Sequence, residues 1–204
     1  MNKKLTISKL DAAKRQLETV IRLYFSNGDP VSIHTLTAAA YNIVRDVNKK
    51  RGGTALWVKE KFLNYVKEGY EKEVREKINA AENFFKHADR DHEQTLDFNP
   101  DQSELLILEA CSVYYQLSGE FPPLFRLFQG WYIANHQRIF NFPEEQQQII
   151  SEAKQDVLQL GKEGYLNMVL PLLMRLNISN QSTRRRLASV VLHRLFACAG
   201  YFNR

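Results

Sequence analysis

The stretch DQSELLILEACSVYYQLSG, residues 101–119, decides the fold class of this chain. Apolar side chains fall on almost every side of a helix drawn through it, and a helix that is apolar all round is buried among other helices. The glycine at its end is a common helix terminator. We therefore predict a central helix here, with four core positions, namely Leu106, Leu108, Val113 and Leu117.

The residues before this segment carry the start signals of amphipathic helices. Ser8 and Asp11 have the spacing of a capping box, and Asp29 followed by Pro30 is typical of a helix start. The glycines of KKRGG, residues 49–53, indicate where the second helix ends. We expect four helices, from Ser8 to about residue 26, from Pro30 to about residue 50, over 55–66 and over 70–88.

Three more helical patterns follow the central segment. They cover residues 124–140, residues 144–160 after Pro143, and residues 165–176, with Gly161 and Gly164 between the last two. No useful stretch alternates apolar and polar residues as a half-buried strand does. We predict an all-α chain whose residues 1–180 form a single helical bundle of about seven helices.

The basic excess of the chain lies in its last segment. The formal net charge is +5, and residues 181–204 contain five arginines and no acidic residue, so the other residues balance. We expect this segment to form a basic amphipathic C-terminal helix packed on the bundle. The alternatives are that it docks on a partner or lies at an anionic surface. The binding residues would then be Arg184, Arg185 and Arg186.

Several classes of function are disfavoured. The chain has no glycine-rich phosphate loop, no paired CxxC, no HExxH and no GxSxG. It has no run of about 18 apolar residues and no secretory leader pattern. Cys111 and Cys198 lie in apolar runs, which is typical of buried free thiols. We expect a cytoplasmic protein with no membrane partner and no cofactor.

The stretch ENFFKHADRDH, residues 82–92, is the candidate site. If the helix reaches about Ala88, Asn83 and His87 lie one turn apart on one face, and His87 is a candidate for proton transfer because histidine titrates near neutral pH. The alternative is that His87 only stabilises the helix end. The candidate binding residues of this stretch are Lys86, Asp89, Arg90 and Asp91.

A metal site is a second interpretation of the same stretch. Its imidazole and carboxylate groups, from His87, Asp89, Asp91 and His92, suit zinc, iron or manganese and would indicate a metal-dependent RNase or hydrolase. Adjacent residues need distant partners to enclose one ion, and no second cluster is evident. We expect His34 and His136 to be structural, and we assign no metal.

The order of these features resembles the HEPN (higher eukaryotes and prokaryotes nucleotide-binding) superfamily of helical bundles. Residues 12–44, AAKRQLETVIRLYFSNGDPVSIHTLTAAAYNIV, resemble its first hairpin, and Asn83 and His87 match the polar and histidine positions of its metal-independent RNase motif. The resemblance implies a site in which the histidine assists proton transfer at a ribose 2′-OH. It also implies a homodimer that pairs the motif helices.

The chain departs from this family motif at one position. The catalytic arginine would fall at residue 82, which is Glu82, and a carboxylate repels the phosphate that an arginine would hold. Arg186 and His193 repeat the spacing, but the apolar LASVVL between them favours a chance match. We therefore predict a HEPN-like protein that acts by binding nucleic acid or a partner protein, with nuclease activity doubtful. A non-catalytic protein interaction module is the alternative.

Overall fold

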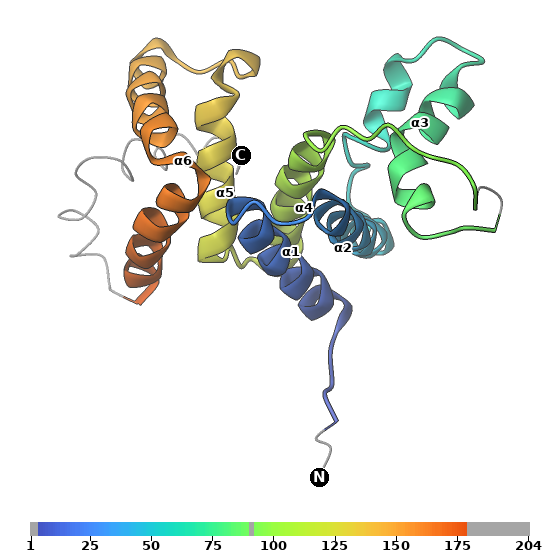
Figure 1. Ribbon diagram of the computed structural model, residues 1–204, viewed down its shortest axis with the longest axis horizontal. Helices are drawn as coiled ribbons and strands as arrows, with labels where there is room; N and C mark the ends of the chain where they lie inside the picture. Colours follow the sequence, from blue (N-terminus) through green and yellow to red (C-terminus); the bar gives the residue numbers. More distant parts are fainter. Residues whose placement is uncertain (1–3, 90–91, 179–204) are drawn as a thin grey trace. The chain divides into compact units, whose positions relative to one another are not determined.

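The computed structural model describes residues 4–89 and 92–178 (Figure 1). Within these ranges it has α-helices and short 3-10 helices and no strand, which confirms the all-α prediction. The predicted helix over 181–204, with its arginines, lies outside the described residues. The described helices gather in two compact units, one formed by residues 4–20 with residues 28–89 and 92–120, the other by residues 21–27 with residues 121–178.

The first unit contains most of the predicted helices. Its elements are the first part of α1 (Lys9–Phe25), α2 (Pro30–Lys50), the 3-10 helix η1 (Lys61–Tyr65), α3 (Glu71–Phe84) and α4 (Gln102–Ser118). Helices α2 and α4 form its main contact. The second unit contains the end of α1, α5 (Pro123–Asn135), the 3-10 helix η2 (Gln137–Ile139) and α6 (Glu144–Ile178), with α5 packed on α6.

Both predicted helix starts have the expected hydrogen bonds. The amide of Asp11 donates to the Ser8 hydroxyl at 3.1 Å, and the Ser8 amide donates back to the Asp11 carboxylate at 3.2 Å. At α2 the Asp29 carboxylate accepts from the amide of Ser32 at 2.7 Å, and Pro30 occupies the first helical position. These side chains satisfy amides that a helix start leaves without intrahelical partners.

Helix α4 is the buried centre of the first unit, as its sequence predicts. Leu106, Leu108 and Val113 are buried, and Leu117 is half-buried near the end of the helix. The Cys111 thiol is also buried, and burial raises its pKa well above the usual value, so it is an unreactive core group. The helix ends at Gly119, whose left-handed conformation suits a residue without a β-carbon.

Residues 55–66 do not form the predicted α-helix. Only Lys61–Tyr65 is helical, as a 3-10 helix, and turns precede it. The amide of Lys61 donates to the carbonyl of Leu56 at 2.8 Å, five residues back instead of four. The amide of Trp57 donates to the carboxylate of Glu109 on α4. A distant side chain therefore holds this backbone in turns, and the local amphipathic pattern does not reveal it.

An aromatic cluster forms the core of the second unit. The ring of Phe25 contacts Phe128, Trp131 and Tyr165, with the Phe25 and Trp131 centroids 5.4 Å apart and nearly perpendicular. The indole nitrogen of Trp131 donates to the Tyr24 hydroxyl at 3.0 Å. Such edge-to-face pairs add to the stability that burial of the rings supplies. Trp131 is itself buried in this core.

Helix α6 is interrupted where the sequence places a separation. Gly161 has φ 63° and ψ −179°, values that a helix does not allow and that glycine adopts readily. Gly164 lies within the helix, so only the first of the two glycines marks the break. Over residues 4–89 and 92–178, no helix combines the length and the apolar content that crossing a bilayer requires.

Two positions of α4 that are two residues apart, Leu105 and Ile107, test this account of the core. Ile107 is 0% exposed, whereas Leu105 is 39% exposed. We expect Ile107→Ala to lower the free energy of unfolding by about 2–5 kcal/mol, because it removes buried methyl groups and leaves a cavity. Urea denaturation of Leu105→Ala is the control, and an equal loss for the two variants would contradict the assigned orientation of α4.

Candidate functional site

The segment 82–92 begins in the last turn of α3, but the helix ends earlier than the sequence suggests. It ends at Phe84 instead of about Ala88, so Asn83 is helical and His87 is not. One backbone hydrogen bond still joins them, from the His87 amide to the Asn83 carbonyl at 3.0 Å. Both side chains are exposed, as are Lys86 and Asp89, while Arg90 and Asp91 lie outside the described residues.

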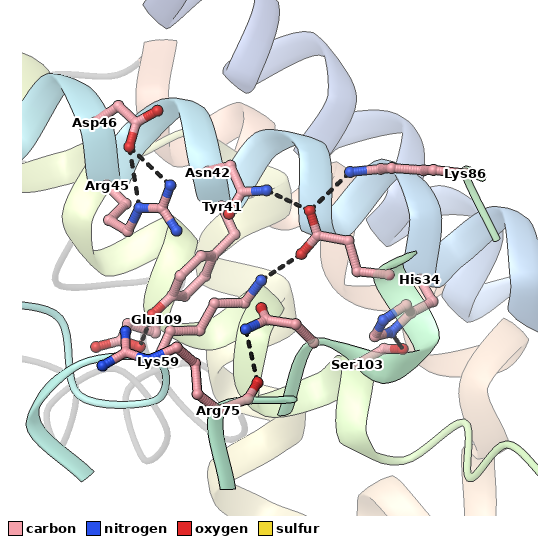
Figure 2. A network of polar contacts seen from close by, with 12 residues as sticks. His34, Tyr41, Asn42, Arg45, Asp46, Lys59, Arg75, Lys86, Ser103 and Glu109 are labelled. Atoms are coloured by element: carbon pink, nitrogen blue, oxygen red, sulfur yellow. Dashed lines mark hydrogen bonds and ion pairs between the residues drawn. The ribbon is translucent and has the colours of Figure 1, made fainter. Parts of the chain in front are cut away.

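Half-buried aromatic rings contact the buried His34 at this helix end. The ring of Phe85 lies edge-on to Phe98 and to His34, with centroid distances of 5.0 and 5.8 Å. His34 is buried, and its Nδ1 is 3.0 Å from the Ser103 hydroxyl (Figure 2). Burial, with the nearby charge of Lys59, lowers the pKa of His34. The expectation that His34 is structural is confirmed.

Glu82 is the centre of the polar network under this segment. Its Oε1 accepts from the Asn42 amide at 2.5 Å and from Lys86 Nζ at 2.8 Å, and its Oε2 forms an ion pair with Lys59 (Figure 2). The side chains of Lys59 and Glu82 are only 4% and 10% exposed. The carboxylate therefore joins α3 to α2 and to the turn before η1.

The electrostatics of this pair follow from burial and neighbouring charge. Burial alone raises the pKa of Glu82, but the hydrogen bonds and charges of Lys59 and Lys86 outweigh it and lower the pKa to about 2. Burial lowers the pKa of Lys59, although Glu82 opposes that shift. A buried charge without a partner is costly, so each of the two groups requires the other.

A second carboxylate, Glu109 of α4, organises the neighbouring turn. It accepts from the Tyr41 hydroxyl at 2.8 Å, from the Val58 amide at 3.0 Å and from the Trp57 amide. Burial and the Glu109 charge raise the pKa of the Tyr41 hydroxyl. The Lys59 ammonium lies 5.4 Å from the centre of the Tyr41 ring. Because Lys59 pairs with Glu82 and Tyr41 donates to Glu109, the polar contacts of the two carboxylates are neighbours.

The chemistry open to Asn83 and His87 is limited by this network. Lys86 is the only cation between residues 82 and 89, and its ammonium is ion-paired with Glu82. Lys59 is buried against the same carboxylate. Residues 82–89 therefore offer a hydrogen-bonding amide and an imidazole to a ligand, without the unpaired cation that stabilises charge on a phosphate. Arg90, the next cation of the segment, lies outside the described residues.

The metal interpretation gains no support from the described part of the chain. It contains no group of three or more His, Cys, Asp or Glu side chains that could hold an ion. His92 approaches only Glu93, at 3.9 Å, and Asp91 is among the residues not described. His136 stacks on the ring of Tyr132 with centroids 4.3 Å apart.

Three residues of the network were not among the site residues predicted from the sequence: Tyr41, Lys59 and Glu109. Glu109 did carry a signal, because it is an acid within an otherwise apolar stretch of a buried helix, where a carboxylate needs hydrogen-bond donors. Lys59 carried none, since LWVKEKF has a lysine at more than one position.

Comparisons with protein-family models, curated proteins and solved structures found no match to this chain.

Glu82→Gln tests the buried ion pair. We expect it to lower the free energy of unfolding at neutral pH by about 3–5 kcal/mol, because Lys59 loses its buried counter-charge. The pKa of Glu82 is lowered from 4.5 to about 2, so this stabilisation is present above pH 4.5 and declines as the pH falls toward 2. Denaturation of both proteins across that range measures the difference.

The control for this substitution lies on the same helix. Glu73 forms an exposed ion pair with Lys77, so Glu73→Gln makes the same chemical change without leaving a buried charge unpaired. We expect no measurable loss of stability from it. A Glu82→Gln protein as stable as Glu73→Gln would show that the buried pair does not contribute to stability.

Glu109→Gln tests the role of the second carboxylate. The substitution weakens the acceptor of the Trp57 and Val58 amides, so we expect these two amides to exchange hydrogen with solvent at least about tenfold faster. Amides in the middle of α2 serve as the internal reference. Unchanged exchange at Trp57 and Val58 would contradict the assigned role of Glu109.

Proposed function

We propose that this chain is a HEPN-like helical protein that acts by binding RNA or a partner protein and does not cleave RNA. One observation carries the proposal. Glu82 occupies the position where the family motif has its arginine, and it is ion-paired with Lys59 and Lys86. The residue that should supply positive charge instead neutralises the nearby cations.

The chemistry of RNA cleavage explains why this matters. Attack of a ribose 2′-OH on the adjacent phosphate needs a group to move the proton and a cation to stabilise developing negative charge. His87 is exposed and suits the first task. Lys86 could serve the second only by leaving Glu82, which would remove one partner from a buried carboxylate.

Exposed groups support a role in binding. The first unit exposes Trp57 and Tyr65, whose ring centroids are 5.6 Å apart, and also Phe62 and Tyr70. Exposed aromatic side chains are common at protein interfaces and serve as stacking platforms for unpaired bases. They favour a binding function, and they fit the alternative of a protein interaction module equally well.

An RNA assay tests the absence of cleavage. Purified wild type and His87→Ala are incubated with end-labelled RNA of mixed sequence, with EDTA and separately with Mg²⁺ or Mn²⁺. We expect the RNA to remain intact and the two proteins to behave identically. Cleavage in EDTA that His87→Ala abolishes would contradict the proposal, and cleavage that requires a metal would favour the hydrolase alternative.

Binding is measured on the same proteins. Fluorescence anisotropy with labelled single-stranded RNA is expected to show weaker binding for the double variant Asn83→Ala with His87→Ala than for wild type, if RNA is the ligand. Asn167→Ala, at an exposed position of α6 in the second unit, is the control, because it lies outside both the 82–92 segment and the exposed aromatic residues around η1. Co-purification identifies a protein partner in the other case, and retention of neither RNA nor protein would contradict a binding function.

The resemblance also implies a homodimer built on the α3 ends, which we include in the proposal. A twofold axis would place two copies of Asn83 and His87 together. Light scattering at tens of micromolar measures the mass directly, and a monomer at that concentration would exclude this assembly.

A further inference from the structure

A groove lies in the first unit along the C-terminal half of α2, beside the start of α1. Its volume is about 320 Å³, which is within the range of ligand-binding pockets. The lining residues are Lys9, Asn42, Ile43, Asp46, Val47, Lys50 and Arg51. None of the candidate residues of segment 82–92 contributes to it.

The spacing of the α2 residues makes the groove elongated. Ile43, Val47 and Arg51 are four residues apart, and so are Asn42, Asp46 and Lys50, so both rows follow one face of the helix. From residue 43 to residue 51 the helix rises about 12 Å. An extended peptide spans that length with about four residues.

The charges around the groove are predominantly positive. Lys9 and Lys50 are exposed, and their side-chain ammonium groups form no hydrogen bond or ion pair with the described residues. The Arg51 guanidinium donates to the carbonyl of Leu117 at 2.8 Å. The one acid in the lining, Asp46, already accepts from two nitrogens of Arg45 at 2.9 and 3.0 Å. An anionic occupant is therefore favoured.

The floor of the groove discriminates between anionic partners. Ile43 and Val47 are half-buried and present aliphatic surface, and none of the described residues that line the groove is aromatic. A nucleic acid strand would find cations but no ring on which a base could stack. A peptide with acidic and aliphatic side chains would use both the cations and the apolar floor.

We propose that this groove binds a short acidic segment of a partner protein, with aliphatic side chains on Ile43 and Val47 and carboxylates on Lys9, Lys50 and Arg51. This inference goes beyond the proposed function, because it concerns residues that the 82–92 segment does not include. A partner segment with alternating carboxylates and leucine-like side chains has the required chemistry.

The test uses a fluorescein-labelled peptide of sequence EELEELE and measures its anisotropy against the full chain at low salt. We expect saturable binding that weakens as salt increases. The peptides KKLKKLK and EESEESE separate the two requirements, since the first reverses the charge and the second removes the aliphatic groups. We expect both to bind at least about tenfold more weakly.

Variants locate the binding to the groove. Lys50→Glu and Lys9→Glu are each expected to raise the Kd on the order of tenfold, and Val47→Ser to raise it about threefold or more. Lys67→Glu is the matched control, because Lys67 is exposed and does not line the groove. Circular dichroism of each variant verifies that the helices are retained.

Three results would overturn the proposal. The first is an absence of EELEELE binding to the wild-type protein. The second is equal loss of binding in Lys67→Glu and Lys50→Glu, which would indicate nonspecific attraction. The third is binding of labelled oligouridylate in preference to EELEELE, which would identify the groove as a nucleic acid site. If His87→Ala changes the cleavage or binding of RNA and does not change the binding of EELEELE, this inference is unaffected. The two proposals can therefore be contradicted independently.

Discussion

The buried ion pair between Glu82 and Lys59 is the interaction on which the first unit most depends. One carboxylate contacts three parts of the chain, since Asn42 lies on α2, Lys59 in the turn before η1, and Lys86 just beyond α3. Both charged side chains are almost completely buried, so water cannot replace a partner that is removed. The position of the 82–92 segment therefore depends on the same contact that fixes the turn.

This dependence connects stability to function. A carboxylate engaged by two lysines and an amide cannot also accept a proton readily, because its pKa is held at about 2. The lysines are equally committed, so a phosphate at Asn83 and His87 would have to compete with Glu82 for them. The function we propose rests on two premises, the resemblance to the HEPN family and the presence of Glu82 where that resemblance would place an arginine.

The sequence predicts what is local and misses what is distant. Local signals predict the helix caps at Ser8 and Asp29 and the buried helix α4, because each signal lies within a few residues of its effect. The helix predicted over 55–66 does not form, and the contact that orders its first residues is distant: the Trp57 and Val58 amides donate to Glu109, over fifty positions away in sequence. The sequence shows the Glu82–Lys86 spacing but does not reveal that Lys59 occupies the other oxygen of the carboxylate.

A double-mutant cycle on Glu82 and Lys59 tests the central claim most directly. The free energies of unfolding of wild type, Glu82→Leu, Lys59→Met and the double variant give the interaction energy of the two side chains. We predict that each single variant is strongly destabilised and that the double variant recovers much of the loss, with a coupling of at least about 2 kcal/mol, because it leaves no unpaired buried charge. Additive losses would contradict the account and show that the two side chains contribute independently.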